Sequence, residues 1–242
     1  MSSKPKLAGQ TLVVIGGSAG IGLETARQAR AEGADVILTG RDVGRLERAV
    51  NEIGALRSVA FDAADADRVD RFFGELPAPV DHVLVTAGGP YYARLVDMDF
   101  AEAGRHLEAR LLVAMRIARQ AMHKVRPGGT LLFVSGVGGR RPSAGPLTVA
   151  LTAAMPALTK SLALEIAPVR VNSIAPGFVD TSLSASLLGG QLDARREELR
   201  RSLPIRRVVG PADVAALAVH IMTNSALTGA TYDIDGGQQL IE

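Results

Sequence analysis

The chain has 242 residues, of which 47% are hydrophobic and 21% charged, and a net charge of only +2, a composition typical of a globular protein with an ample core. It contains no cysteine, which excludes disulfides, cysteine nucleophiles and thiolate metal ligands, and its basic residues form no stripe of the kind that binds nucleic acid. The polar N-terminus and the absence of an apolar run of about 18 residues predict neither a secretion signal nor a membrane span, so we expect a cytoplasmic protein, and we predict no metal site.

Short apolar runs alternate along the chain with longer helical patterns. Most of the runs are continuous stretches of β-branched residues and Leu, which is typical of strands buried on both faces of a parallel sheet. The predicted strands are 11–16, 35–40, 57–61, 82–88, 130–136, 169–177 and 231–235. The predicted helices are 21–32, 43–53, 65–75, 99–124, 147–167 and 211–223. This order predicts an α/β fold of the Rossmann type, a doubly wound parallel sheet of seven strands with helices on both faces, in a single domain over residues 1–242.

The first predicted strand and helix are joined by a glycine-rich turn within VVIGGSAGIGLETARQ, residues 13–28. Its spacing places Gly16, Gly20 and Gly22 where the backbone turns tightly and approaches a ligand closely. Free N–H groups at the start of the helix suit a pyrophosphate. A P-loop is excluded because Leu23 stands where that motif needs lysine. We therefore predict a cofactor site here, although a tight turn without a ligand has the same composition.

The end of the second predicted strand indicates which dinucleotide is preferred. An acid at this point would bind the 2′-hydroxyl of a ribose and repel a 2′-phosphate. The sequence reads Leu38-Thr39-Gly40-Arg41, and the next acid is Asp42. The fixed cation and planar donors of Arg41 suit a phosphate, so the pattern favours NADP(H) over NAD(H). The alternative is that Arg41 only lies in solvent at the edge of the sheet.

Several stretches resemble the short-chain dehydrogenase/reductase family, from about Leu7 to Leu240. The matching stretches are Gly16–Gly22, Asp62-Ala63, Ala87-Gly88, NSIAPGFVDT (172–181) and the C-terminal stretch 206–237. The resemblance implies a Rossmann-type oxidoreductase that uses a nicotinamide dinucleotide. With Arg41, the predicted cofactor-binding residues are Gly16, Ser18, Gly20, Ile21, Gly22, Asp62, Ala63, Ala87, Gly88, Pro176, Gly177, Val179 and Thr181. Ile15, Val85 and Thr86 depart from the family's pattern.

The proton-transfer residues of the family are mostly replaced. By the resemblance, a serine orients the substrate oxygen, a tyrosine passes it a proton, a lysine lowers the pKa of that tyrosine, and an asparagine holds a water. The stretch 158–172 sets the register: the serine position is Ser135, the tyrosine position Thr148, the lysine position Thr152, and the asparagine position falls on or near Arg110. An aliphatic hydroxyl does not titrate at working pH, and loss of a positioned acid or base typically costs about 10²–10⁴-fold in rate.

Pro156 lies within the predicted helix 147–167. It cannot donate a backbone hydrogen bond to the carbonyl of Thr152, and its ring crowds that carbonyl. We therefore expect the helix either to kink at this point or to begin after it, although Met155 would be a poor N-cap. In either case the backbone at the start of this helix would differ from the family's, in addition to the substituted side chains.

Other side chains are candidates for the missing chemistry, so that the predicted catalytic residues are Ser135, Tyr91, Tyr92, His106 and Arg110. Tyr91 and Tyr92 follow the fourth strand, in a loop that opens toward the nicotinamide in this fold. Either phenol could donate a proton, and the alternative is a pocket wall or a subunit contact. His106 and Arg110 lie one helical turn apart, so Arg110 could restore the lost cation and His106 titrates in the right range. A polar network that fills the site is the favoured alternative.

The arginine-rich stretch LDARREELRRSLPIRR, residues 192–207, stands where the family has a mobile substrate lid, which we expect at 180–207. Charge runs on helices are usually solvated faces with i,i+4 ion pairs, and this interpretation is favoured. The alternative is a lid that attracts an anionic small-molecule substrate together with Arg140 and Arg141.

Two hypotheses about function follow. The first is an NADP(H)-dependent oxidoreductase with a non-standard site, which acts on a small carbonyl, alcohol or imine. The second is a cofactor-binding protein without turnover, acting as a sensor or a partner subunit. Retention of the cofactor motifs without the proton relay fits the second, whereas the predominance of enzymes in the family favours the first. The resemblance also leads us to expect a homotetramer or homodimer, with no nucleic-acid or membrane partner.

Overall fold

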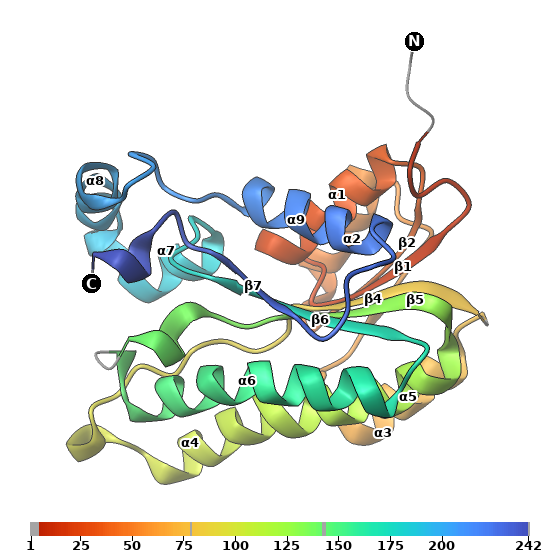
Figure 1. Cartoon of the computed structure of the whole chain (residues 1–242), viewed down its shortest axis with the longest axis horizontal. Coiled ribbons are helices and arrows are strands. Elements are labelled where there is room, and N and C mark those ends of the chain that lie inside the picture. Colours follow the sequence, from red (N-terminus) through yellow and green to blue (C-terminus); the bar gives the residue numbers. More distant parts are fainter. Residues whose placement is uncertain (1–4, 78, 142–143, 242) are drawn as a thin grey trace.

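The computed structural model describes residues 5–77, 79–141 and 144–241. Seven parallel strands form one sheet in the order β3-β2-β1-β4-β5-β6-β7, which confirms the predicted doubly wound sheet (Figure 1). The strands are β1 Thr11–Ile15, β2 Asp35–Gly40, β3 Arg57–Ala60, β4 Val80–Val85, β5 Val125–Val134, β6 Arg170–Pro176 and β7 Thr231–Ile234. The strand order reverses between β1 and β4, and ligands of such sheets bind outside the carboxyl ends of the strands at this point.

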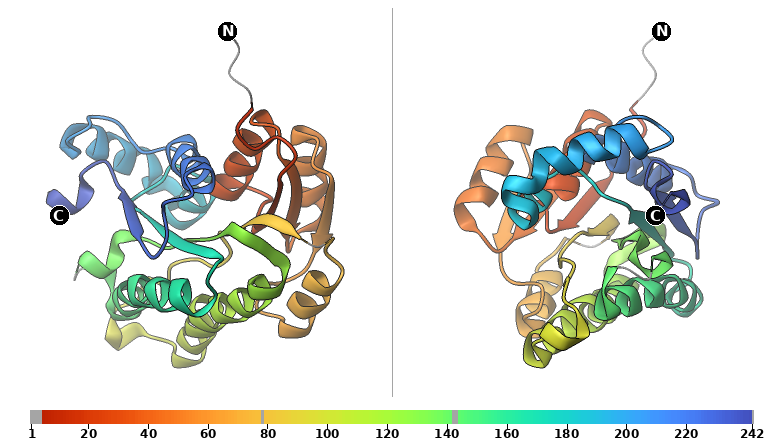
Figure 2. Two further views of the ribbon diagram at one scale, coloured as in Figure 1. Left: turned by 45° about the vertical axis from the view of Figure 1, so that its right-hand side comes forward. Right: turned by 90° about the vertical axis from the view of Figure 1, so that its left-hand side faces the viewer.

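Helices cover both faces of the sheet. In Figures 1 and 2, α1, α2 and α9 lie on one face, and α3, α5 and α6 lie on the other. Their bounds are α1 Gly20–Ala31, α2 Val43–Ile53, α3 Ala66–Gly74, α5 Val113–Lys124, α6 Pro146–Glu165 and α9 Pro211–Thr223. Alternate residues of β1 serve the two layers: Val13 packs in the cluster with Phe72 of α3, and Leu12 in the cluster with Ala26 of α1. Both faces of the sheet are buried, which explains the continuous apolar runs in the sequence.

The predicted helix 99–124 is in fact two helices joined by a wider turn. α4 Phe100–Leu107 is followed by the π-helical turn Glu108–Leu112, and α5 begins at Val113. Turns of this kind are rare and frequently lie at functional sites. This one contains Arg110, one of the predicted catalytic residues.

α6 is continuous through Pro156, so the expectation that this helix might begin only after the proline is wrong. Pro146 occupies the start of the helix, where its missing N–H has no partner to lose. Met155 and Leu162 are buried in the core and hold the helix on both sides of Pro156. In the part of the chain that the structure describes, α6 is also the one helix long and apolar enough to cross a membrane, but it packs against β6 as a core helix.

Two short helices occupy the segment 180–207, at the edge where the strands end (Figure 2, right). They are α7 Ser182–Leu188 and α8 Leu192–Ser202. Thr181 caps α7 by a reciprocal pair of bonds: its Oγ1 accepts from the N–H of Ser184 at 3.3 Å, and the hydroxyl of Ser184 accepts from the N–H of Thr181 at 2.8 Å. Thr181 therefore sets where the chain turns away from β6.

At the amino edge of the sheet, His82 of β4 is buried and neutral. The residue is 2% exposed, and its Nε2 lies 2.7 Å from Oε1 of Gln10. Burial, reinforced by the positive charges of Arg170 and Arg126, lowers the pKa of His82 to about 3. The imidazole therefore stays uncharged over the range in which a solvated histidine titrates.

We expect the free energy of unfolding to decrease as the pH falls from about 6.5, the usual histidine pKa, toward the folded-state pKa of about 3. In this window the unfolded chain binds a proton at residue 82 and the folded chain does not. The slope from this one group is up to about 1.4 kcal/mol per pH unit, and its contribution is constant above the window. Urea unfolding at several pH values measures the slope. It should be shallower in His82→Gln and unchanged in His123→Gln, because His123 is exposed. Equal slopes in all three proteins would contradict this expectation.

Candidate cofactor and substrate site

The glycine turn between β1 and α1 leaves no room for side chains. Gly16 has a φ of +99°, and a Cβ on it would lie 2.6 Å from Oγ1 of Thr86 and 2.9 Å from the backbone nitrogen of Ala87. A Cβ on Gly22 would lie 2.3 Å from the carbonyl oxygen of Gly16. The N-cap residue Ala19 has no side chain that could cap the helix. The backbone itself therefore forms the surface at the positive end of α1, as a phosphate site requires.

Thr86, which departs from the family's pattern, has a defined partner in the glycine turn. Its hydroxyl donates to the carbonyl of Gly16 at 2.8 Å, and its backbone N–H donates to the carbonyl of Ile15 at 2.9 Å. The end of β4 is thereby fixed against the turn that follows β1. Sequence reasoning identified the substitution but not this role, because the two residues are 70 positions apart.

Four of the predicted cofactor residues gather at the ends of β2 and β3. Arg41 is exposed, and its Nη1 lies 3.9 Å from Oδ2 of Asp62, which also has an exposed side chain. Ser18 lies against the end of β2, because a Cβ on Gly40 would meet its Oγ at 3.1 Å. Next to Asp62, Ala63 packs against the core. This edge thus holds one accessible cation beside a hydroxyl and a carboxylate.

The predicted residues of the segment after β6 face the glycine turn. A Cβ on Gly20 would lie 3.6 Å from Cβ of Thr181. Gly177 is pressed against the C-terminal segment, because a Cβ there would meet Oε1 of Gln238 at 2.5 Å. The same oxygen accepts a hydrogen bond from the N–H of Phe178 at 2.8 Å. Gln238 is 1% exposed and was missed at the sequence level, because nothing in a lone glutamine near the C-terminus indicates this contact.

The remaining predicted cofactor residues have less direct positions. Val179 is bridged to Val209, and Ile21 packs against the core. Gly88, with a φ of +96°, faces the π-helical turn, because a Cβ on it would lie 3.8 Å from the carbonyl oxygen of Ala109. The carbonyl of Pro176 lies 3.7 Å from the Cβ position of Gly136, just after Ser135. The structure therefore brings the predicted cofactor segments to one edge of the sheet.

Ser135 and the two threonines of α6 have different environments. The backbone N–H of Ser135 donates to the carbonyl of Ile174 at 2.7 Å, whereas its Oγ is buried without a hydrogen-bond partner among the described residues. Thr148 and Thr152 are both buried. Each has its hydroxyl committed to a backbone carbonyl: Thr148 donates to Tyr91 and Thr152 to Thr148, both at 2.7 Å. Of the three hydroxyls, that of Ser135 alone keeps its hydrogen-bonding capacity for a ligand.

Tyr91 and His106 form a local structural contact. Their rings stack with centroids 5.0 Å apart. The hydroxyl of Tyr91 accepts from the N–H of Asp99 at 3.1 Å, at the residue that caps α4. These contacts indicate that Tyr91 stabilises the start of α4, in line with the non-catalytic alternative.

Tyr92 points its hydroxyl into a different environment. The residue is 64% exposed, yet desolvation around the hydroxyl raises the pKa of Tyr92, while the positive charges of Arg141 and Arg110 act in the opposite direction. The phenol therefore lies within electrostatic range of two cations from separate elements.

Arg110 lies at the mouth of a small cavity between the sheet and α5 and α6. Its Nη1 donates to the carbonyl of Val134 at 3.0 Å, directly before Ser135. The other residues that line the cavity carry no charge: Val85, Ala87, Ala109, Val113, Ala114, Phe133, Val134 and Met155. Burial lowers the pKa of Arg110, and the charge of Tyr92 opposes this shift. Arg110 therefore presents a desolvated cation beside Ser135.

The arginine-rich stretch is largely paired within itself. In α8, Arg195 pairs with Glu198 at 2.8 Å and Arg200 with Glu197 at 3.4 Å, at a spacing of i,i+3 rather than the expected i,i+4. Arg207 pairs with Asp213 at 2.6 Å. The interpretation of a solvated face with local ion pairs thus describes most of this stretch.

Arg196 instead holds α8 to the segment after β6. Its Nε and Nη2 donate to the two oxygens of Asp180 at 2.9 and 2.8 Å, and Nη1 donates to Asp193. These bonds raise the pKa of Arg196, with Asp180 the largest cause. Arg140 pairs with Asp233 of β7 at 2.7 Å. Arg141 is influenced electrostatically by Arg195, Tyr92 and Asp235.

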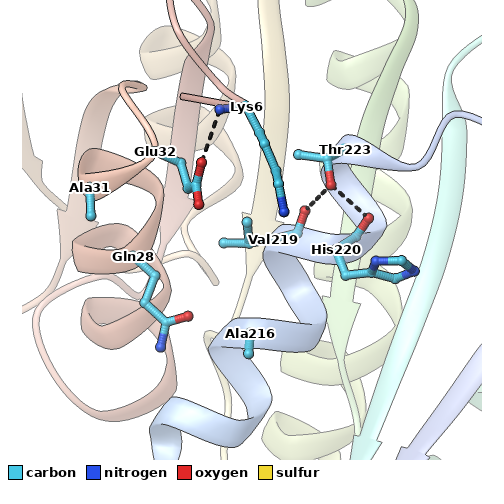
Figure 3. Close-up of a pocket in the computed structure, with 8 residues that line it drawn as sticks. All are labelled: Lys6, Gln28, Ala31, Glu32, Ala216, Val219, His220 and Thr223. Carbon is cyan, nitrogen blue, oxygen red and sulfur yellow. Dashed lines mark hydrogen bonds between the residues drawn. The ribbon is translucent and has the colours of Figure 1, made fainter. Parts of the chain in front are cut away.

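A second hollow lies between α1 and α9, away from the predicted site (Figure 3). Its lining includes Lys6, Gln28, Glu32 and His220. The backbone N–H of Lys6 donates to Oε2 of Glu32 at 2.9 Å. Lys6 precedes β1, and the other three residues lie in or directly after the last turns of α1 and α9, at the end of α1 that is remote from the glycine turn. None of the predicted site residues lines it.

The sheet order, the glycine turn and the gathered carboxyl-end segments define a Rossmann-type α/β protein. A family model described as enoyl-(acyl carrier protein) reductase matches residues 16–239. The short-chain dehydrogenase/reductase ATR9 of Stachybotrys chlorohalonatus is 31% identical, over 96% of this chain and 98% of the relative. The chain belongs to the short-chain dehydrogenase/reductase family of oxidoreductases.

Two solved structures of similar proteins contain a dinucleotide. A small-chain dehydrogenase in complex with NADPH is 28% identical, with a TM-score of 0.82 over 96% of this chain and 99% of that one. BdcA in complex with NADPH is 27% identical, with a TM-score of 0.85 over 96% of this chain and 95% of that one. Both agree with the fold described above.

Proposed function

We propose that this chain is an NADP(H)-dependent oxidoreductase that acts on a small carbonyl, alcohol or imine without the Tyr–Lys pair of its family. The observation that carries the proposal is the cradle at the start of α1, where a Cβ on Gly22 would lie 2.3 Å from a backbone oxygen. Such close backbone packing beside an uncapped helix start suits a pyrophosphate. The NADPH complexes of the two solved relatives support the same cofactor.

The end of β2 supports NADP(H) rather than NAD(H). Arg41 is exposed and offers its guanidinium to a 2′-phosphate. The acid next to it, Asp42, is committed elsewhere: its Oδ1 accepts from the N–H of Arg45 at 2.8 Å and caps α2. These bonds lower the pKa of Asp42. A carboxylate held by the helix in this way is not positioned to bind a ribose hydroxyl.

We assign substrate orientation and proton delivery to residues of the chain, and hydride transfer to the cofactor. When bound, a reduced nicotinamide supplies a hydride to an electrophilic carbon and becomes oxidised. The buried Oγ of Ser135 can donate to the substrate oxygen. That oxygen also needs a proton, and we assign its delivery to Tyr92, because the hydroxyl of Tyr91 is bonded to the backbone of Asp99. Desolvation raises the pKa of Tyr92, and the positive charges of Arg141 and Arg110 offset part of this shift by favouring the phenolate that remains after the transfer.

Fluorescence titration with NADPH and with NADH tests the cofactor assignment. We expect tighter binding of NADPH, and we expect Arg41→Ala to lose about 10- to 100-fold in affinity for NADPH, the range of one charge-assisted contact, while NADH is little affected. Arg48→Ala is the matched control, since Arg48 is an exposed residue of α2. Equal affinity for both dinucleotides in the unchanged protein would contradict the proposal.

The oxidation of NADPH with a panel of carbonyl and imine substrates tests turnover. Tyr92→Phe should lower a measured rate by about 10²-fold or more, as expected for loss of a positioned acid, whereas Tyr91→Phe and His106→Gln should have smaller effects. If Tyr92→Phe leaves the rate unchanged, the proton has another source.

A cofactor-binding protein without turnover is the second candidate. One observation favours it: the hydroxyls of both Thr148 and Thr152 donate to backbone carbonyls, so neither side chain that replaces the Tyr–Lys pair faces a reacting group. Tight binding of NADPH without oxidation by any substrate of the panel would support this candidate over the first.

A further inference from the structure

Arg110 occupies an unusual position for a cation. Its guanidinium lies in a cavity whose other lining residues are uncharged, and it makes one hydrogen bond, to the carbonyl of Val134. Throughout residues 5–77, 79–141 and 144–241, no carboxylate lies within ion-pair distance of it. Desolvation lowers the pKa of Arg110, but a guanidinium remains charged in proteins. Arg110 is half-buried, and a partly desolvated charge without a counter-ion is unfavourable for the folded chain.

The position of this cation relates it to the reacting atoms of the proposed reaction. Its hydrogen-bond acceptor is the carbonyl of Val134, and the next residue is Ser135, whose Oγ is buried without a partner. Gly88, in the segment assigned to the cofactor, lies opposite the same π-helical turn. A ligand group that reaches Arg110 is therefore close to whatever Ser135 binds.

We propose that Arg110 binds a carboxylate of the substrate, and that the substrate is a small oxo acid, or the corresponding hydroxy acid, whose carboxylate lies close to the reacting carbon. This inference rests on the proposed function and specifies its substrate class. A planar guanidinium and a planar carboxylate form paired hydrogen bonds, and phosphate, which can pair with arginine in the same way, is the competing anion in the test below.

In the reaction, the oxo acid takes up a hydride at its carbonyl carbon and a proton at its oxygen and becomes the hydroxy acid, while NADPH is oxidised to NADP⁺. Arg110 supplies charge and no proton, since it remains protonated.

Calorimetric titration of the NADP⁺-loaded protein tests this assignment. The probes are acetoacetate and 2-oxobutanoate, the methyl ester of each, and inorganic phosphate. We expect the acids to bind about 10- to 100-fold more tightly than their esters, the range of one charge-assisted contact, and more tightly than phosphate. In Arg110→Met this preference should disappear, and in Arg110→Lys it should be partly retained. Arg105→Met is the matched control, because Arg105 is exposed on α4.

Two accompanying measurements separate the possible failures. Thermal melting shows whether each variant is folded, and the acids should raise the melting temperature of the unchanged protein but not that of Arg110→Met. Fluorescence titration with NADPH should give the same affinity for Arg110→Met as for the unchanged protein. If NADPH does not bind at all, the proposed cofactor is wrong. The acids are then titrated against the cofactor-free protein, and the substrate inference stands only if their preference over the esters is lost in Arg110→Met.

Several results would overturn the inference. In one, the esters bind as tightly as the acids. In another, the preference for acids survives in Arg110→Met. Tighter binding of phosphate than of either acid would reject the carboxylate class. A loss of NADPH affinity in Arg110→Met, with the acids unaffected, would show that Arg110 serves the cofactor instead.

Discussion

Replacement of Arg170 by methionine is expected to lower the free energy of unfolding by about 3–5 kcal/mol. The guanidinium of Arg170 is buried at the start of β6, and it donates to six acceptors at 2.5–3.1 Å. The acceptors are the carbonyls of Gly128, Ile221, Met222, Asn224 and Leu227 and the hydroxyl of Thr130. The substitution removes all of these donors and leaves the acceptors buried.

Two of these carbonyls, those of Ile221 and Met222, belong to the last turn of α9, whose final carbonyls have no partners within the helix. A cation at this end also interacts favourably with the negative end of the helix dipole. Arg170 thus joins the end of α9 to the loop before β7 and to β5.

Urea unfolding followed by circular dichroism measures the effect. Arg119→Met is the control, because Arg119 has an exposed side chain and its ion pair with Asp70 at 3.7 Å contributes little. Where Arg170→Met does not fold, Arg170→Lys keeps the charge and loses the fork of donors, and it should be destabilised by a smaller amount. A stability equal to that of the control would show that water replaces the guanidinium without cost.

The second large effect is expected from Gly22→Ala, which should weaken NADPH binding by about 100-fold, the cost typical of a misplacement of about 1 Å. Its Cβ would lie 2.3 Å from the carbonyl oxygen of Gly16 and 2.8 Å from Oγ1 of Thr86. Both neighbours belong to the cradle, and the first is backbone, so the turn itself must move. Because alanine otherwise favours a helix, the loss is not explained by helix propensity.

Gly104→Ala is the matched control, since Gly104 lies in α4 with no atom within 4 Å of the added Cβ. That variant should bind NADPH normally and unfold at a similar or higher temperature. Fluorescence titration gives the affinities, and thermal melting shows that Gly22→Ala is folded. Unchanged affinity in Gly22→Ala would mean that the dinucleotide does not bind at this turn.

The fold was largely predictable because burial on both sides of the sheet leaves a direct mark on the sequence. Runs such as Leu12–Ile15 and Val83–Val85 are apolar without interruption, and their order along the chain specifies the layers. The π-helical turn Glu108–Leu112 was not predictable, because apolar periodicity does not register a change in backbone hydrogen bonding. The predicted range 147–167 nearly matches α6, but the alternative of a start after Pro156 was wrong, because the buried contacts of Met155 and Leu162 outweigh the local effect of the proline.

For the candidate site, the sequence indicated which residues gather at the carboxyl edge but not what their polar atoms contact. The glycine spacing identifies the turn, since only glycine fits there. By contrast, the hydroxyl of Thr148 donates to a carbonyl 57 positions away, and the guanidinium of Arg110 to one 24 positions away. Such partners are set by the packing of separate elements, which a single sequence does not encode in any local pattern. The distinct environments of Tyr91 and Tyr92 arise in the same way.

The bond between Thr148 and the backbone of Tyr91 also bears on how this site can change over generations. Tyrosine at position 148 and lysine at position 152 would not by themselves give the proton relay typical of the family. The carbonyl of Tyr91 would lose the donor that now lies 2.7 Å from it, and the adjoining loop would need compensating substitutions. A Tyr–Lys pair at these positions would therefore require coordinated substitutions in α6 and in the loop that carries Tyr91.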